Sequence, residues 1–196
     1  VDALPQLGFA LWPQRPVAAM LSLASNPRLT STTSSAGRLF DAVSAIAGLC
    51  DEQSDEAQAA MLLEAAGGDF ADASYEDDDF VVTQESGLNV LQVTALLQRL
   101  FAMRLEGQTP QAISMRFHAA FSAGMAKLAA ECFPAGATVC LSGGTFLNRF
   151  VAADLSRRLR QMGYRTYLPS LLPPGDGAIS FGQCAVARQR LDAATH

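Results

Sequence analysis

The sequence predicts an α/β fold, and its C-terminal third carries the clearest evidence. Short apolar runs at 137–141 and 164–169 predict strands. Each is followed by a segment with helical spacing of apolar residues, 146–162 and then 178–191. Strand, helix, strand and helix in this order form a β-α-β-α unit. With 196 residues, 49% of them hydrophobic and 17% charged, the chain has a globular composition with ample material for a core.

The first third of the chain is expected to be helical. One helix is predicted over 17–24, and a second follows the Ser- and Thr-rich entry at 30–35. Gly48 near the end of that second helix fits a C-terminal stop. A third helix is predicted over 55–67, which is dense in strong helix formers. The acidic stretch 67–79 is expected to form a loop or the edge of a hairpin.

The middle of the chain predicts one strand and two long helices. The strand covers 80–84, which is rich in β-branched residues and begins with Phe. A helix with an apolar face is predicted over 90–107. Another is predicted over 109–133, because Thr109 can cap its start and Pro110 suits the first helical position.

The bulk properties limit the classes of partner. Net charge is −5 and the isoelectric point about 4.9, which argues against broad binding of nucleic acid through its phosphates. No apolar run is long enough to span a bilayer, and the N-terminus lacks the pattern of a signal peptide. The four cysteines are scattered and are expected to be buried, reduced thiols. We therefore expect a cytoplasmic protein without nucleic-acid or membrane partners. Because an initiator Met is absent, an internal piece of a longer protein is expected.

Three segments place glycine and small polar residues beside a predicted helix start: 33–43, 141–149 and 172–183. In the second, a Ser-Gly-Gly turn at 142–144 joins a strand to a helix. Glycine lets the backbone approach a ligand closely, and a helix N-terminus offers N–H groups with partial positive charge. The turn matches neither a Walker loop nor a G-x-G-x-x-G fingerprint, so taken alone a plain turn is the more frequent interpretation.

Individual side chains leave alternatives open. Asp41 is either a solvated charge or a carboxylate that accepts hydrogen bonds from ribose hydroxyls. Asp176, between two glycines at a helix start, is either a helix cap, favoured on the residues alone, or a ligand of a hard cation. Arg38 is expected at the surface or in an ion pair rather than as a phosphate clamp. His118 lies among apolar residues and is expected in the core or at its boundary. Catalytic residues cannot be read from any Ser/His/Asp or Cys/His arrangement.

Five separated motifs together resemble the C-terminal part of the hydrogenase-maturation carbamoyltransferase family, HypF. In chain order they read TSSAGRLFDAVSAIAGL, DEAQAAMLLEAA, ISMRFHAAF, CLSGGTFLNR and LPPGDGAISFGQCAVA. The likeness covers most of residues 28–191 and extends, more distantly, to the tRNA threonylcarbamoyladenosine transferases. It implies one lobe of an actin/Hsp70/sugar-kinase-like ATPase fold with additional helices. Residues 31–196 would be the nucleotide-binding lobe of the carbamoyltransferase domain, and 1–30 a segment leading out of a missing upstream lobe.

The resemblance also implies an activity. HypF proteins use carbamoyl phosphate and ATP to form carbamoyl-adenylate and carbamoylate the C-terminal cysteine of a partner, HypE. The product becomes the cyanide ligand of [NiFe]-hydrogenase. The chain alone is expected to be inactive, because catalysis by positioning needs groups from both sides of a cleft. Two alternatives remain: an O-carbamoyl or threonylcarbamoyl transferase of the same fold, and a non-catalytic nucleotide-binding module.

The residues implied to bind ATP are Gly37, Asp41, Ser142, Gly143, Gly144 and Asn148. Asp176 matches a metal-ligand aspartate of the wider family. The divalent ion, which would be Mg, Zn or Fe, needs further ligands from residues outside this chain.

The chain departs from the family pattern at three places. Ala57 stands where the family usually has glycine, which puts close backbone approach there in doubt. Gly175 and Ala178 replace an asparagine and a glycine in the last motif.

Overall fold

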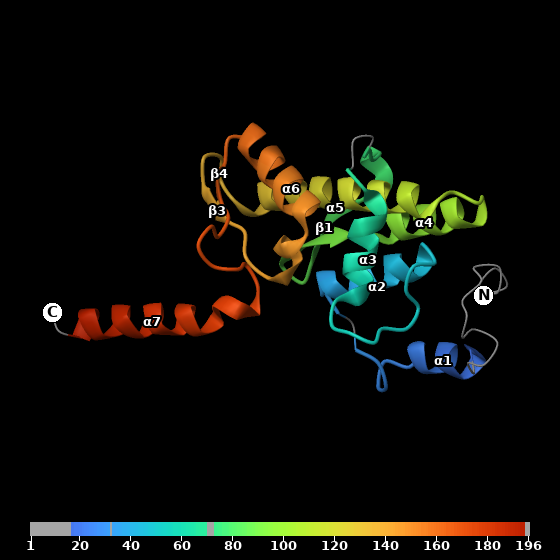
Figure 1. The fold of residues 1–196 in the computed structure, drawn as a ribbon, viewed down its shortest axis with the longest axis horizontal. Coiled ribbons are helices and arrows are strands. Elements are labelled where there is room, and N and C mark those ends of the chain that lie inside the picture. Colours follow the sequence, from blue (N-terminus) through green and yellow to red (C-terminus); the bar gives the residue numbers. More distant parts are fainter. Residues whose placement is uncertain (1–16, 32, 70–72, 195–196) are drawn as a thin grey trace. The chain divides into compact units, whose positions relative to one another are not determined.

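The computed structural model describes residues 17–31, 33–69 and 73–194 as α-helices with two small two-stranded sheets (Figure 1). The α/β fold class expected from the sequence is confirmed. Nothing in the described part of the chain forms a helix that is both long and apolar enough to cross a membrane.

The described residues divide into two compact units. Unit 1 holds the residues up to Thr83 together with Leu91–Ala120, and unit 2 holds Gln84–Val90 together with the residues from Phe121 onward. Each unit is described by itself.

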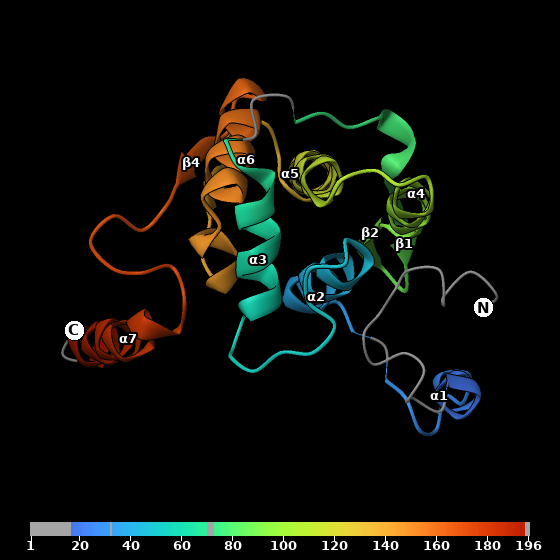
Figure 2. The same cartoon turned by 45° about the vertical axis from the view of Figure 1, so that its right-hand side comes forward.

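Unit 1 is built from helices, as the sequence indicates. Its elements are α1 (Val17–Ala24), α2 (Ala36–Ile46), α3 (Gln58–Gly67), the 3-10 helix η3 (Asp77–Asp79), α4 (Thr94–Leu105) and the first half of α5 (Pro110–Cys132). Helices α2 and α3 lie side by side, and α2 also packs on α4 (Figure 2). The rings of Phe40 and Phe117 meet edge to face, with centroids 4.8 Å apart, in the centre of this core.

Start and stop residues explain where these helices begin and end. Thr109 Oγ1 accepts a hydrogen bond from the N–H of Ala112 at 3.2 Å, so α5 begins as the Thr-Pro pair predicts. Ser35 caps α2 by accepting from the N–H of Arg38. Gly48 follows α2 with a φ of +74°, the left-handed conformation typical of a helix stop.

A β-hairpin corrects the sequence interpretation of the middle segment. Strand β1 (Val81–Glu85), expected from the sequence, pairs with β2 (Leu88–Gln92). Ser86 and Gly87 both have positive φ, 51° and 81°, as a tight two-residue turn requires. The helix predicted to begin at residue 90 therefore begins at Thr94, because the residues before it extend the hairpin.

Unit 2 contains the β-α-β-α unit that the sequence predicts. Strands β3 (Thr138–Cys140) and β4 (Arg165–Tyr167) are parallel, with Val139 opposite Thr166. Helix α6 (Arg149–Gln161) connects them and packs against the sheet through apolar side chains. The core consists of Ala126, Val139, Leu141, Leu155, Leu159 and Tyr164.

Two 3-10 turns and a long helix complete unit 2. The turn η4 (Gly144–Leu147) lies between β3 and α6, and η5 (Asp176–Ala178) leads into α7 (Ile179–Ala194). Helix α6 thus begins three residues later than the predicted 146, because η4 occupies that position. Within this unit α7 contacts η5, and every residue from 179 to 193 is exposed.

Candidate functional site

The Ser-Gly-Gly turn after β3 is held in place by a loop far along the chain. The N–H of Gly143 donates to the carbonyl of Pro174 at 2.7 Å, and Ser142 Oγ donates to the same oxygen at 3.3 Å. Gly143 has φ 111° and ψ 162°, a conformation that essentially only glycine adopts. The turn and the 173–177 loop therefore form one folded feature, which we call the glycine turn.

Open space lies beside Gly144. An added Cβ there would meet no atom within 4 Å, and Gly144 does not have positive φ. Gly175 packs against it from the other loop, because a Cβ on Gly175 would lie 3.5 Å from Gly144 Cα. The glycine turn thus has one face in contact with its own loop and an exposed backbone at Gly144, where a ligand can approach.

Asn148 has a structural role at the start of α6. Its side chain is buried, and Oδ1 accepts a hydrogen bond from the N–H of Val151 at 3.0 Å. This is an N-cap, and it fixes the direction in which α6 leaves the glycine turn. A nucleotide-facing role for Asn148 stays a prediction.

Asp176 presents a bare carboxylate. It is exposed at the first position of η5, and within the described residues its side chain has no hydrogen bond or ion pair. The helix-cap interpretation favoured from the residues alone is therefore wrong. Among the described residues, no group of three or more His, Cys, Asp or Glu side chains lies close enough together to hold a metal ion. One carboxylate does not satisfy a divalent ion, so these residues alone do not make a metal site.

Gly37 and Asp41 lie one turn apart on α2, in unit 1. A Cβ on Gly37 would be 3.6 Å from Ser35 Oγ, an ordinary contact, so the helix itself does not require glycine there. Asp41 Oδ2 lies 2.9 Å from Arg38 Nη2, and this ion pair agrees with the expectation for Arg38. The geometry of that contact is not that of a hydrogen bond, so Oδ2 accepts none among the described residues. This oxygen is buried and ion-paired with Arg38, so it is not open to a ligand in this structure.

The structure thus groups the predicted residues in two sets. Ser142, Gly143, Gly144, Asn148 and Asp176 belong to the glycine turn and its neighbours in unit 2, whereas Gly37 and Asp41 share one helix face in unit 1. The sequence does not predict that the Pro174 carbonyl anchors the turn, because local patterns do not reveal contacts between segments so distant along the chain.

His118 belongs to the core, as expected. It is fully buried, and its Nδ1 donates to the carbonyl of Ser114 at 2.8 Å. Burial lowers the pKa of His118 to about 4, so the imidazole is neutral near pH 7. The expectation of buried thiols is wrong for Cys132, Cys140 and Cys184, which are exposed.

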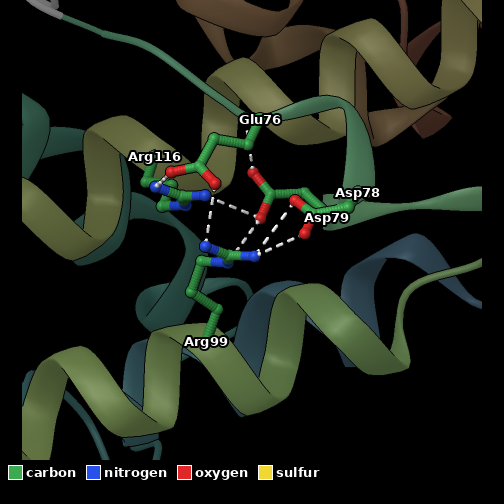
Figure 3. A network of polar contacts seen from close by, with 5 residues as sticks. All are labelled: Glu76, Asp78, Asp79, Arg99 and Arg116. Atoms are coloured by element: carbon green, nitrogen blue, oxygen red, sulfur yellow. Dashed lines mark hydrogen bonds and ion pairs between the residues drawn. The ribbon is translucent and has the colours of Figure 1, made fainter.

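A network of charges anchors the acidic stretch before β1 (Figure 3). Asp79 is fully buried, and its Oδ1 lies 2.8 Å from Arg116 Nη2 and 3.2 Å from Arg99 Nε. Its Oδ2 accepts the N–H of Glu76 at 2.9 Å. Arg99 also binds the carboxylate of Asp78. Since the carboxylates come from residues 76–79 and the two arginines from α4 and α5, the network ties three segments together and has no group free for chemistry at Asp79.

The chain is similar to known proteins of the family that the five motifs resemble. Residues 6–183 match the family described as carbamoyltransferase, Kae1-like domain, second subdomain. The chain is 37% identical to a carbamoyltransferase HypF homolog of Cupriavidus necator, over 92% of this chain and 46% of that protein. It is also 37% identical to the carbamoyltransferase HypF of Rhizobium leguminosarum bv. viciae, over 96% of this chain and 24% of that protein. The chain therefore spans less than half the length of these relatives.

Two solved structures share the fold. One is full-length HypF in its phosphate- and nucleotide-bound form, with 33% identity and a TM-score of 0.68 over 81% of this chain and 21% of that one. The other is HypF of T. kodakarensis, with 26% identity and a TM-score of 0.60 over 82% of this chain and 20% of that one. The resemblance drawn from the five motifs is confirmed.

Proposed function

Because the chain belongs to the HypF carbamoyltransferase family, we propose that it is the second subdomain of a Kae1-like domain that transfers a carbamoyl group. The observation that carries the proposal is 37% identity to HypF relatives over more than nine-tenths of the chain. Since the chain spans only part of those relatives, the carbamoyl donor, the acceptor and the cofactor are proposed for the complete protein. The exposed thiols suit a reducing compartment, and we place the protein in the cytoplasm.

The proposed reaction has two stages. Water first hydrolyses carbamoyl phosphate to carbamate and phosphate. A carbamate oxygen then attacks the α-phosphorus of ATP, the new P–O bond gives carbamoyl-adenylate, and pyrophosphate leaves. The thiolate of the C-terminal cysteine of a HypE-like protein then attacks the carbamoyl carbon. The C–S bond forms, the C–O bond to the adenylate phosphate breaks, AMP leaves, and the thiol proton passes to solvent. The S-carbamoyl product is the precursor of the cyanide ligand of [NiFe]-hydrogenase.

In this proposal the glycine turn receives the phosphates of the nucleotide. Gly144 offers exposed backbone without a side chain, and Ser142 and Gly143 are held by Pro174 so that the turn keeps its shape. A solved HypF structure that aligns with this chain is a phosphate- and nucleotide-bound form, which supports a nucleotide ligand for the family. Separately, we assign Asp41 on α2 to the ribose hydroxyls, on the resemblance of its motif to the HypF family.

Asp176 is assigned to a divalent cation completed by residues outside this chain. The carboxylate is exposed and accepts no hydrogen bond from described residues, so it is available. When bound, such an ion would supply positive charge near the phosphates of the nucleotide.

The proposal is tested by following the carbamoyl group in the whole protein that contains this chain. Labelled carbamoyl phosphate, ATP and a HypE-like acceptor are mixed, and the label is located by mass spectrometry. We expect it on the C-terminal cysteine, only with ATP present, and not on an acceptor carrying alanine there. Label on a small-molecule hydroxyl or on a tRNA nucleoside would contradict the proposed thiol acceptor.

Asp176→Ala provides a second arm of that experiment. We expect a lower rate of carbamoyl transfer with an unchanged melting temperature, because the carboxylate makes no contact that stabilises the fold. Normal transfer per folded molecule would remove Asp176 from the site.

A further inference from the structure

The two segments of the glycine turn are joined through one carbonyl oxygen. Among the described residues, every hydrogen bond that links 168–177 to a preceding part of the chain ends on the Pro174 carbonyl. Two donors meet there, the N–H of Gly143 at 2.7 Å and Ser142 Oγ at 3.3 Å. Pro173 and Pro174 have no N–H of their own, so neither adds a backbone donor. We call this three-atom contact the proline clamp.

The proline clamp determines where the Asp176 carboxylate lies. Gly175 follows the clamped carbonyl and packs on the other segment, because a Cβ there would lie 3.5 Å from Gly144 Cα. Asp176 comes next and begins η5 with an exposed side chain. On its far side, a Cβ on Gly177 would lie 3.0 Å from Pro173 Cγ, so this part of the loop is close-packed against itself. Asp176 is thus held one residue away from contact with the exposed backbone of Gly144.

The two donors of the proline clamp have no proton left for a phosphate. A serine hydroxyl carries one proton, and Ser142 donates it to the Pro174 carbonyl. The single N–H of Gly143 is donated to the same oxygen. Phosphate oxygens are strong hydrogen-bond acceptors, so they need donors from the protein. Direct contact of Ser142 or Gly143 with a phosphate through these protons would therefore require the clamp to open.

We propose that Ser142 is a positioning residue, which holds Asp176 beside the backbone of Gly144 through the proline clamp and does not itself bind the nucleotide. The inference rests on the proposed function, because it assigns Ser142 a role in that same site. It differs from the expectation drawn from the family resemblance, in which Ser142 is one of the residues that bind ATP. The geometry of the clamp supports the indirect role, since the hydroxyl proton points to protein.

Removing the hydroxyl should loosen the proline clamp without unfolding the unit. Ser142→Ala leaves the shorter bond from the Gly143 N–H in place, so we expect an unchanged melting temperature. The Gly143 amide should exchange with deuterium about fivefold faster, because the clamp opens more often. Fivefold corresponds to about 1 kcal/mol, the usual net worth of one hydrogen bond. Ser142→Thr, which keeps a hydroxyl, should restore the slow exchange.

A double-mutant cycle in the complete protein separates positioning from direct binding. The quantity measured is kcat/KM for ATP in carbamoyl-phosphate-dependent formation of AMP. Ser142→Ala should lower it about fivefold when Asp176 is present. In the Asp176→Ala background it should cause no further loss, because the carboxylate that the clamp positions is gone. Ser170→Ala is the matched control, since Ser170 is exposed in the same loop and has no hydrogen bond among the described residues.

Two results would overturn the inference. An unchanged exchange rate of the Gly143 amide in Ser142→Ala would show that the hydroxyl does not hold the loop. A fivefold loss of kcat/KM that persists in the Asp176→Ala background would show that Ser142 acts independently of Asp176. If the wild type forms no AMP, the proposed transfer reaction fails, and the exchange measurement still decides whether Ser142 holds the proline clamp.

Discussion

Ala57 occupies a position where the backbone favours glycine. It has φ 60° and ψ 11°, directly before α3, and is one of two non-glycine residues with positive φ in the described chain. This left-handed conformation brings Cβ close to the following carbonyl, at a cost of about 1–2 kcal/mol. Glycine adopts this conformation without that cost, so Ala57 is a point of local backbone strain.

Replacing Ala57 with glycine should stabilise the protein. Relief of strain outweighs the added freedom of the unfolded chain, which costs about 0.4–1 kcal/mol, so a net gain of roughly 0.5–1 kcal/mol is expected. Urea unfolding measures it. Ala65→Gly, on the exposed side of the same helix, is the matched control and should lose about 1 kcal/mol. A loss in both variants would show that Ala57 is not strained.

His118 should make stability depend on pH. Burial lowers its pKa from 6.5 in the unfolded chain to about 4, while the nearby Glu64 acts in the opposite direction. The neutral imidazole favours the folded state, so this contribution is complete above pH 6.5 and is lost as pH falls towards 4. At about 1.4 kcal/mol per pKa unit the loss is on the order of 3 kcal/mol.

The measurement is the free energy of unfolding at a series of pH values for the wild type and His118→Gln. Glutamine does not titrate and retains a donor for the Ser114 carbonyl. The stability difference between the two proteins should shrink as pH falls from 6.5 to 4. A difference that is constant with pH would mean that the histidine is protonated equally in both states.

Among the elements, those with local start or stop signals were predictable and those defined by distant contacts were not. Thr109 and Pro110 gave the start of α5, whereas the β2 strand was hidden because its apolar residues merge with the helical spacing of α4. The Ser86–Gly87 pair was the available signal for the hairpin. The glycine turn was predicted from its residues, but its anchoring by Pro174 is a long-range contact that periodicity cannot reveal.

The η3 segment should depend on the buried carboxylate of Asp79. Asp79→Asn keeps the size of the side chain but removes the charge that Arg99 and Arg116 share. Breaking a buried pair typically costs about 3–5 kcal/mol, and because both arginines are partly exposed we expect about 2–3 kcal/mol. Asp77→Asn, an exposed neighbour in the same turn, should change stability by less than about 0.5 kcal/mol. Equal losses of unfolding free energy in the two variants, measured by urea unfolding, would show that Asp79 contributes only as a surface charge.

For the whole molecule, the chain is a member of a carbamoyltransferase family that spans 46% and 24% of two longer relatives. Asp41 lies on α2 in unit 1, whereas the glycine turn and Asp176 lie in unit 2. Because the chain covers less than half of these relatives, we propose carbamoyl transfer for the complete protein.

The most direct test of this account is carbamoyl-phosphate-dependent conversion of ATP to AMP and pyrophosphate by the complete protein carrying Gly144→Ala. The added methyl group meets no protein atom within 4 Å, so melting should be unchanged. It would occupy the space assigned to the phosphates, and a displacement of about 1 Å can cost on the order of a hundredfold in rate. Gly182→Ala, also in open space but on α7, is the matched control and should retain full activity. We predict a loss of at least about tenfold in kcat/KM for ATP in Gly144→Ala alone. Normal AMP formation in that variant, or none in the wild type, would contradict the assignment of the glycine turn to the nucleotide.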